Sequence, residues 1–217
     1  MTLTFGTDGV RGRAHDELTV ADVERLSHVA CSVLDTDTLV VGTDTRESGP
    51  DFVDAICRGA SRAGVNAWLI GVAPTPAVAF AAAREGVAGA MVSASHNPYH
   101  DNGVKFFGPG GRKLSDRQQS DIEAALKDPD PGPASSSGSP TLRSELLDDY
   151  EAWVADTATA DLSGLRVVVD SANGAAAGVA TRVLESLGVT VESIHDKPDG
   201  TNINRNCGST DMSDLRS

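Results

Sequence analysis

Short apolar runs alternate with helical patterns along most of the chain, and this alternation limits the possible folds more than any other feature. Strands are expected at 38–44, 66–73, 88–95 and 103–107, and helices at 19–33, 48–64, 75–86 and 115–128. Thr19 can cap the first helix together with Asp22, three residues later. Strands that alternate with helices of this length predict an α/β fold. The expected domain is a three-layer α/β/α arrangement whose mixed sheet is covered on both faces.

The second part of the chain predicts a smaller unit. The segment 128–140, DPDPGPASSSGSP, is rich in Pro, Gly and Ser and has no apolar periodicity, so it is expected to be a linker or an exposed loop. A helix is expected after it, and then one strand–turn–helix–strand unit, which is thin for an independent domain. We therefore predict a first domain over 1–134, a linker over 128–140 and an incomplete second α/β/α domain over 141–217.

Charge and composition exclude several classes of protein. The net charge is −13, with 31 acidic against 18 basic residues, and a field of that sign repels nucleic acid and anionic membranes. No apolar run approaches the roughly 20 residues of a membrane span, and the N-terminus lacks the pattern of a signal peptide, so we expect a cytoplasmic protein. Lysine is scarce beside arginine, and with the surplus of carboxylates this suggests a salt-adapted, halophilic source.

The three cysteines are Cys31, Cys57 and Cys207, and no two of them form a C-x-x-C pair. This odd and widely spaced set argues against a disulfide framework and against a zinc site. Cys31 and Cys57 lie within helical patterns and are expected to be small core residues.

A polar loop, SASHNPYHDNG, follows the strand at 88–95 and places Ser95 beside His96. Ligand sites of α/β domains lie at such strand ends. Arg11, Arg46 and Lys105 are cations that could surround an anion there. A plain turn and surface ion pairs are the alternatives. A hydrolase is not indicated, because adjacent Ser and His side chains are expected to diverge and no G-x-S-x-G elbow is present.

Taken together, the motifs resemble those of the α-D-phosphohexomutases, in particular their phosphoglucosamine mutase branch. The matching segments, in the family's order, are FGTDGVRG at 5–12, GTDTRESG at 42–49, PTPA at 74–77, SASHNPYHDNGVKFF at 93–107 and DGTNINRNCGST at 199–210. The active-serine signature of the family more often has Thr where this chain has Ser93. The resemblance covers the chain from Phe5 to about Thr210.

The resemblance implies a reaction and assigns residues to it. Ser95 would be the phosphoserine that exchanges a phosphoryl group with a phosphosugar, by way of a bisphosphorylated intermediate. Mg²⁺ would bind the phosphate of Ser95, Arg11 and Lys105 would hold its oxygens, and His96 would position the sugar or transfer a proton. Weaker roles, in binding phosphate or supporting the loop, fall to Thr7, Arg46 and Asn97. The resemblance also allows a homodimer.

The chain departs from the family in one respect that matters for the metal. The family's other magnesium ligands lie in a D-G-D-x-D-R loop, and this sequence contains no such string. We therefore expect a truncated N-terminal part that is inactive by itself. The alternative is a non-catalytic module that binds sugar phosphates or nucleotides through the turn at 171–178. That turn lacks G-x-G-x-x-G, and Gly174 and Gly178 more simply allow a tight turn.

Overall fold

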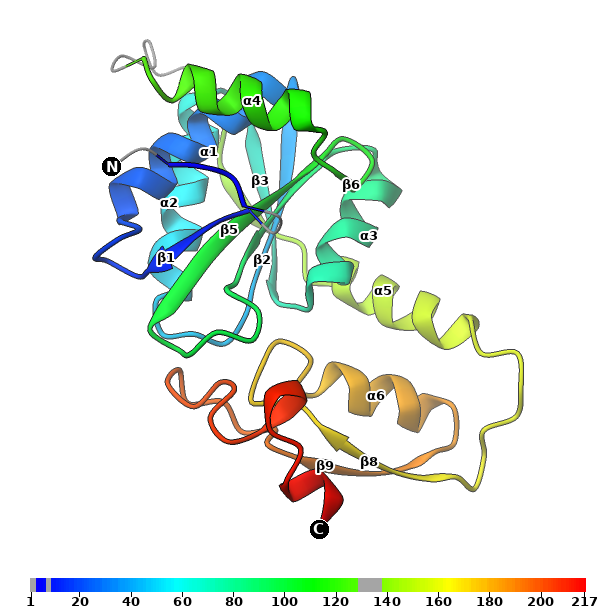
Figure 1. The fold of residues 1–217 in the computed structure, drawn as a ribbon. Coiled ribbons are helices and arrows are strands. Elements are labelled where there is room, and N and C mark those ends of the chain that lie inside the picture. Colours follow the sequence, from blue (N-terminus) through cyan, green and yellow to red (C-terminus); the bar gives the residue numbers. More distant parts are fainter. Residues whose placement is uncertain (1–2, 7–8, 129–137) are drawn as a thin grey trace.

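The computed structural model of this chain describes residues 3–6, 9–128 and 138–217, and its larger part is built on a mixed sheet (Figure 1). The sheet has seven strands in the order β1-β5-β4-β2-β3-β7, with β6 paired to β5. Its strands are β1 (Val10–Arg13), β2 (Thr38–Thr43), β3 (Asn66–Val72), β4 (Ala88–Val92), β5 (Asp101–Gly108), β6 (Arg112–Lys113) and β7 (Pro140–Leu142). The strands β4, β2, β3 and β7 run parallel, whereas β5 is antiparallel to β1 and to β4.

Helices cover both faces of this sheet, which confirms the predicted α/β class with three layers. The helices are α1 (Val20–Leu34), α2 (Gly49–Arg62), α3 (Thr75–Glu85) and α4 (Asp116–Ala125). Side chains alternate across a strand, and the two hydrophobic clusters show the result: Val41 of β2 packs in the cluster of α1, α2 and α4, while its neighbour Val40 packs with α3. Thr19 and Asp22 form the expected capping box at the start of α1.

Three strands of the sheet were not expected from the sequence. β1 and β6 are short and rich in polar residues, so neither has the apolar run of a buried strand. β7 lies at the sheet edge beside β3, with all three of its residues exposed. β7 extends the first sheet beyond residue 134. The domain limits 1–134 and 141–217 remain a prediction. Most of the predicted linker, 129–137, lies outside the described residues.

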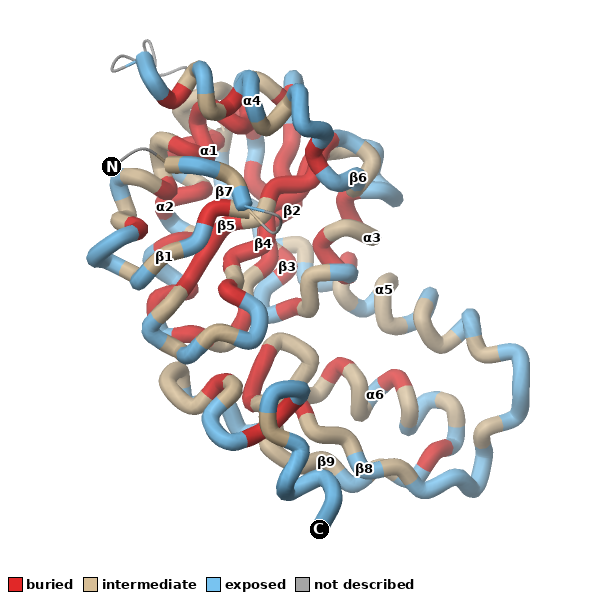
Figure 2. The backbone as a smooth tube through the Cα atoms, in the orientation of Figure 1, coloured by how far each residue is buried: buried red, intermediate tan, exposed pale blue. Residues whose placement is uncertain are grey.

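The remaining elements form a smaller unit next to the large sheet (Figure 1). They are α5 (Glu145–Asp156), β8 (Arg166–Asp170), α6 (Val179–Ser186), β9 (Thr190–Ile194) and the 3₁₀ turns Gly208–Thr210 and Asp214–Arg216. β8 and β9 form a parallel pair, and α5 contacts both α3 and α6. Buried residues are concentrated in the large sheet and are sparse in this unit (Figure 2).

Two further sequence expectations can be compared with this fold. Cys31 is buried in the cluster of α1 and α2, and the half-buried Cys57 packs against the same cluster, so both cysteines are core residues as expected. Among the described residues, no helix has the length and apolar character that crossing a membrane requires.

Candidate functional site

Ser95 follows β4 in a loop that is held in an uncommon backbone conformation. Its φ angle is 58°, in the left-handed region that non-glycine residues rarely occupy, and the residue is exposed. The Ser95 amide donates to the Ser93 hydroxyl over 3.0 Å, and that hydroxyl donates to Oδ2 of Asp44 over 2.6 Å. Asp44 directly follows β2, which pairs with β4, so the loop after β4 is attached to the end of its neighbouring strand.

The Arg46 side chain holds this loop through hydrogen bonds to its backbone carbonyls. Its guanidinium is buried and paired with Asp44, Nε to Oδ2 at 2.9 Å, with 0% and 3% of the two side chains exposed. The remaining guanidinium N–H groups donate to loop carbonyls, namely those of Ser95, Asn97, Pro98 and Asp101. Of the two roles considered for Arg46, the geometry favours loop support over phosphate binding, since its donors point to protein carbonyls.

The smaller unit contacts the same loop through Asn204. The Asn204 amide donates from Nδ2 to the Ser95 carbonyl over 2.9 Å and to the Asn97 carbonyl over 3.0 Å. Nearby, the Glu47 amide donates to the Gly200 carbonyl over 2.9 Å. Asn204 lies in the matched motif at 199–210, but the sequence analysis assigned it no role, because nothing local indicates that it reaches a residue more than one hundred positions away.

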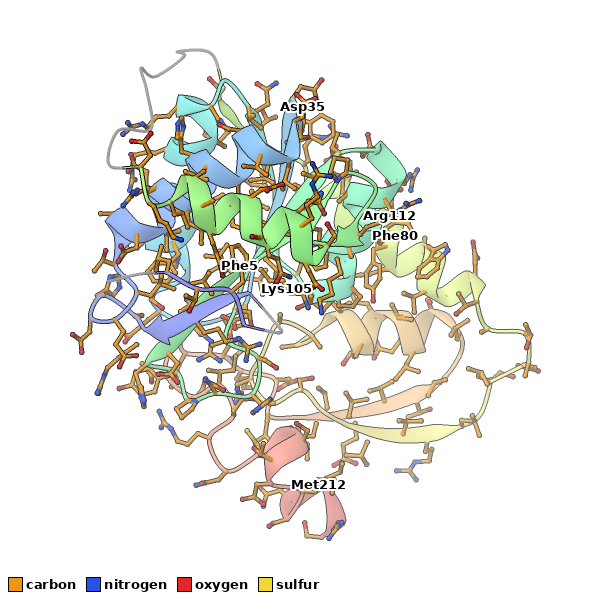
Figure 3. All side chains as sticks on the ribbon, turned by 45° about the horizontal axis from the view of Figure 1, so that its top comes forward. Phe5, Asp35, Phe80, Lys105, Arg112 and Met212 are labelled. Atoms are coloured by element: carbon orange, nitrogen blue, oxygen red, sulfur yellow. The ribbon has the colours of Figure 1, made fainter. Side chains whose placement is uncertain are left out.

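Ser95 opens onto a small pocket that also contains Arg11 and Lys105. The pocket measures about 110 Å³ and is lined by Arg11, Thr75, Met91, Ser93, Ser95 and Lys105. The sheet register explains the grouping, since Arg11 of β1 lies opposite Gly103 of β5 and Lys105 lies opposite Met91 of β4. Figure 3 shows the Lys105 side chain near the centre of the molecule. Ser95 and the two cations that were predicted to surround its phosphate therefore line one pocket.

The close packing of β1 against β5 at the pocket depends on the absence of a side chain at Gly103. A Cβ atom at this position would lie 2.7 Å from the Arg11 Cγ atom and 3.0 Å from the Ser93 carbonyl oxygen. The strands β1 and β5 can therefore approach closely enough to bring Arg11 beside Ser95 only because residue 103 has no side chain. Thr75, at the start of α3, also lines the pocket; its PTPA motif was among the segments that carry the resemblance, but the sequence analysis assigned Thr75 no role.

The remaining predicted residues lie around the loop. His96 is exposed, and its Nδ1 lies 3.4 Å from the Ser95 hydroxyl. The expected divergence of these two side chains is therefore wrong, because the left-handed backbone at Ser95 turns them to the same side. Among the described residues, no carboxylate is hydrogen-bonded to His96, so these residues form no Ser-His-Asp arrangement. Asn97 donates to Asp101 within the loop over 3.0 Å. Thr7 lies outside the described residues.

The described residues of this pocket do not form a magnesium cage. Mg²⁺ prefers oxygen ligands in octahedral geometry, and the described lining of the pocket contains two cations and no carboxylate. The carboxylate of Asp44, which contacts the pocket residue Ser93, already accepts hydrogen bonds from Ser93 and from Arg46. The chemistry that this arrangement supports is the binding of a phosphoryl group on Ser95, whose oxygens would meet two fixed positive charges.

The turn after β8 does not have the features of a dinucleotide site. Gly178 precedes α6 with a φ angle of 81°, and a Cβ at Gly174 would make only ordinary contacts. The two glycines are consistent with a tight turn. The carbonyl of Asn173, from this turn, accepts a hydrogen bond from the Thr45 hydroxyl, so the turn contacts the large sheet beside the serine loop.

Comparisons with known proteins agree with this geometry. Residues 2–132 match the family model described as phosphoglucomutase/phosphomannomutase, alpha/beta/alpha domain I. The chain is 43% identical to a phosphoglucosamine mutase of Desulforamulus reducens, over 97% of this chain and 49% of the relative. It is 45% identical to one of Deinococcus radiodurans, over 98% and 50%. The solved structure of a putative phosphomannomutase from Thermus thermophilus superposes with a TM-score of 0.79 at 29% identity, covering 93% of this chain and 47% of that one. The chain thus spans about half the length of the curated relatives it matches.

Proposed function

Because the chain belongs to the phosphoglucomutase/phosphomannomutase family, we propose that it supplies the phosphoryl-carrying serine of a phosphoglucosamine mutase. Such an enzyme would interconvert the 6-phosphate and 1-phosphate of glucosamine. The observation that carries the proposal is the shared pocket of Ser95, Arg11 and Lys105. The relatives named as phosphoglucosamine mutases support the choice of substrate.

In the proposed reaction, a hydroxyl oxygen of the phosphosugar forms a bond to the phosphorus carried by Ser95 as the bond between that phosphorus and the Ser95 oxygen breaks, which gives a bisphosphorylated sugar. The proton of the sugar hydroxyl ends on the Ser95 oxygen, and His96, with Nδ1 3.4 Å from that oxygen, is placed to transfer it. Arg11 and Lys105 neutralise the phosphoryl oxygens during the transfer. In the second step the Ser95 oxygen takes the phosphoryl group from the other position of the sugar, and the serine proton ends on the released sugar oxygen.

Rigid support of the loop contributes to this chemistry. Ser95 keeps a left-handed backbone because Arg46, Ser93 and Asn204 all bond to the loop. Preorganisation of this kind fixes the nucleophile before the substrate arrives, so the loop need not reorganise during transfer. Asn97 and Thr7 complete the proposed site, Asn97 through its contact with Asp101.

We propose Mg²⁺ as the cofactor, bound to the phosphate of Ser95 and supplying charge neutralisation there. The described residues provide no carboxylate cage for it, so we expect the 217-residue chain alone to carry phosphate without robust turnover. A phosphosugar substrate, a homodimer and a cytoplasmic location are further parts of this proposal.

Phosphopeptide mass spectrometry tests the proposal directly. The purified chain is incubated with a hexose 1,6-bisphosphate, and phosphate is expected on the peptide that contains Ser95. Ser95→Ala should remove the signal. Ser32→Ala, which alters another exposed serine, should leave it unchanged. Equal labelling of the Ser95→Ala protein, or no labelling of Ser95 in the unmodified chain, would contradict the assignment of Ser95 as phosphoryl carrier.

A further inference from the structure

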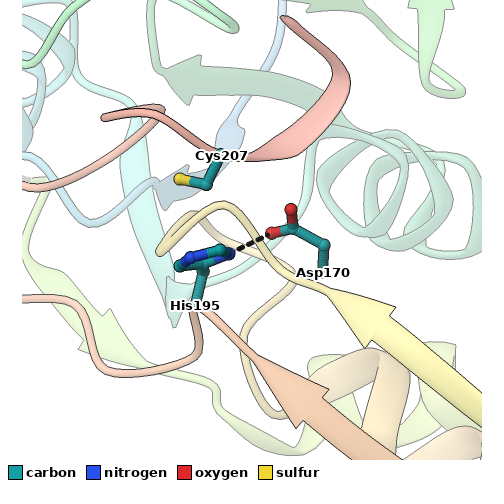
Figure 4. A group of neighbouring side chains, drawn as sticks. All are labelled: Asp170, His195 and Cys207. Atoms are coloured by element: carbon teal, nitrogen blue, oxygen red, sulfur yellow. Dashed lines mark hydrogen bonds and ion pairs between the residues drawn. The ribbon is translucent and has the colours of Figure 1, made fainter. Parts of the chain in front are cut away.

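A second group of reactive side chains lies in the smaller unit, apart from the Ser95 pocket. Asp170 ends β8, His195 follows β9, and Cys207 immediately precedes the 3₁₀ turn Gly208–Thr210. One ligand atom of each residue lies within 4.8 Å of the other two. Figure 4 shows the His195 ring directed at Asp170, with the Cys207 side chain close to both. Within the residues that the structure describes, this is the group of His, Cys and acidic side chains with the spacing of a metal site.

The hydrogen bonds of His195 indicate that a positive charge belongs beside its ring. Nδ1 lies 3.1 Å from Oδ1 of Asp170, and Nε2 lies 3.1 Å from Oδ2 of Asp214. A neutral imidazole has a single N–H group. If Nε2 donates to Asp214, the lone pair of Nδ1 faces a carboxylate oxygen of Asp170. A metal ion bound by both atoms would replace this repulsion by two favourable contacts.

The buried groups beside Nδ1 of His195 favour a metal ion. Cys207 is fully buried and Asp170 has 4% of its side chain exposed, so a thiol and a carboxylate flank Nδ1 away from bulk water. Asp170 is oriented by two backbone amides, those of Ala172 at 2.9 Å and Gly208 at 2.8 Å. A histidine that ligates a metal typically donates its other N–H to a carboxylate, and Asp214 is in the position for that contact.

We propose that Asp170, His195 and Cys207 bind a divalent transition metal ion of the zinc class. Sulfur, imidazole nitrogen and carboxylate oxygen are the ligands that Zn²⁺ takes in proteins. Three protein ligands leave a fourth position for water, and the partial exposure of His195 means that the site is not sealed from solvent. The same donor set does not suit Mg²⁺, which prefers oxygen. The site is therefore distinct from the magnesium proposed at Ser95.

A metal ion here would add a further link between the paired strands β8 and β9 and the segment that contains Cys207. It would tie the ends of β8 and β9 to the segment that contains Asn204 and Cys207. The backbone N–H of Asn204 donates to the Ala172 carbonyl over 2.9 Å, and the side-chain amide of Asn204 donates to the Ser95 carbonyl. Metal binding would thus stabilise the segment from which the smaller unit contacts the serine loop.

Cobalt is the probe for the experiment, because a thiolate bound to Co²⁺ gives a charge-transfer band that a site of oxygen and nitrogen lacks. The 217-residue chain is treated with a chelator, dialysed and titrated with Co²⁺. We expect one equivalent to bind with a thiolate band, which Zn²⁺ then displaces, and we expect Zn²⁺ to raise Tm. Cys207→Ser should abolish the band, whereas Cys57→Ser should keep it as the matched control. Asp214→Asn should weaken binding about 10–100-fold without removing the band.

Protection of the thiol provides a second readout that needs no variant. With Zn²⁺ present, alkylation of Cys207 under mild denaturant should slow at least tenfold relative to the metal-free chain, while alkylation of Cys57 should not change. Absence of metal binding by the chelator-treated, folded chain would overturn the proposal and leave a protonated imidazole between Asp170 and Asp214. A thiolate band that persists in Cys207→Ser would overturn it as well.

Discussion

Replacing Arg46 by methionine is the sharpest test of how the serine loop is held. Methionine fills a similar volume but removes every guanidinium donor. In the native chain Arg46 pairs with Asp44 at 2.9 Å and donates to the carbonyls of Ser95 and Asn97 at 3.0 and 2.9 Å. All of these contacts are made by a side chain with 0% exposure, so water cannot replace the lost donors.

The expected loss in the free energy of unfolding follows from the charge of Asp44, which remains buried without its partner. Removing one partner of a buried ion pair leaves an uncompensated carboxylate, here Asp44, at about 3–5 kcal/mol. Ser95 and Asn97 keep one donor each because Asn204 also bonds to their carbonyls, so we do not add a full penalty for each lost hydrogen bond. A loss of this size in a chain of 217 residues lowers Tm by about 6–20 °C.

Chemical denaturation followed by circular dichroism measures the change in the free energy of unfolding. Arg58→Met is the matched control, because Arg58 pairs with Glu24 at 2.8 Å but is 50% exposed, and an exposed pair contributes at most about 1 kcal/mol. The double variant Asp44→Asn with Arg46→Met should lose less than Arg46→Met alone, since the stranded charge is gone. A loss below 1 kcal/mol for Arg46→Met, or one equal to that of the control, would refute the proposed support of the loop.

Two further substitutions test the geometry near the site, and a third prediction concerns the reactivity of Cys57 in α2. Gly103→Ala should lower the free energy of unfolding by about 1–3 kcal/mol, because the new Cβ would lie 2.7 Å from the Arg11 Cγ atom; denaturation measures it. Asn204→Ala removes two hydrogen bonds to the loop carbonyls, so amide exchange in the loop after Ser95 should speed up about tenfold, as hydrogen-exchange mass spectrometry can detect. Burial raises the pKa of Cys57 to about 11, so its thiolate fraction, and with it the alkylation rate measured by peptide mapping, should stay low at pH 8 and rise until the pH passes that value.

Each of these changes has a control in the same chain. Gly6→Ala should be tolerated, because a Cβ there would have its nearest contact at an ordinary 3.5 Å. Asn66→Ala alters an exposed amide far from the loop and should leave loop exchange unchanged. Cys31 is buried, with a pKa raised to about 12 by desolvation, and should not react while the chain is folded. Equal effects in a variant and its control would contradict the corresponding prediction.

The sequence predicted most of the large domain because its information is local. Apolar periodicity marks the faces that α1, α2, α3 and β2 bury, and the capping pair of Thr19 and Asp22 marks a helix start. The edge strand β1 was missed, since a four-residue polar segment is stabilised by its pairing with β5 rather than by its own pattern. That pairing decides where Arg11 lies.

For the candidate site, the sequence by itself identified Ser95, its strand end and the cations that surround it. Only the tertiary structure decided what those cations do: Arg46 is buried under the loop, while Arg11 and Lys105 line the pocket. The surroundings of Cys207 were also decided by the tertiary structure: its isolated position in the sequence argued against a metal site, yet the fold places it beside Asp170 and His195. Burial and long-range approach determine a side chain's role. Neither is encoded in the spacing of residues, so the group of Asp170, His195 and Cys207 becomes visible only once the chain is folded.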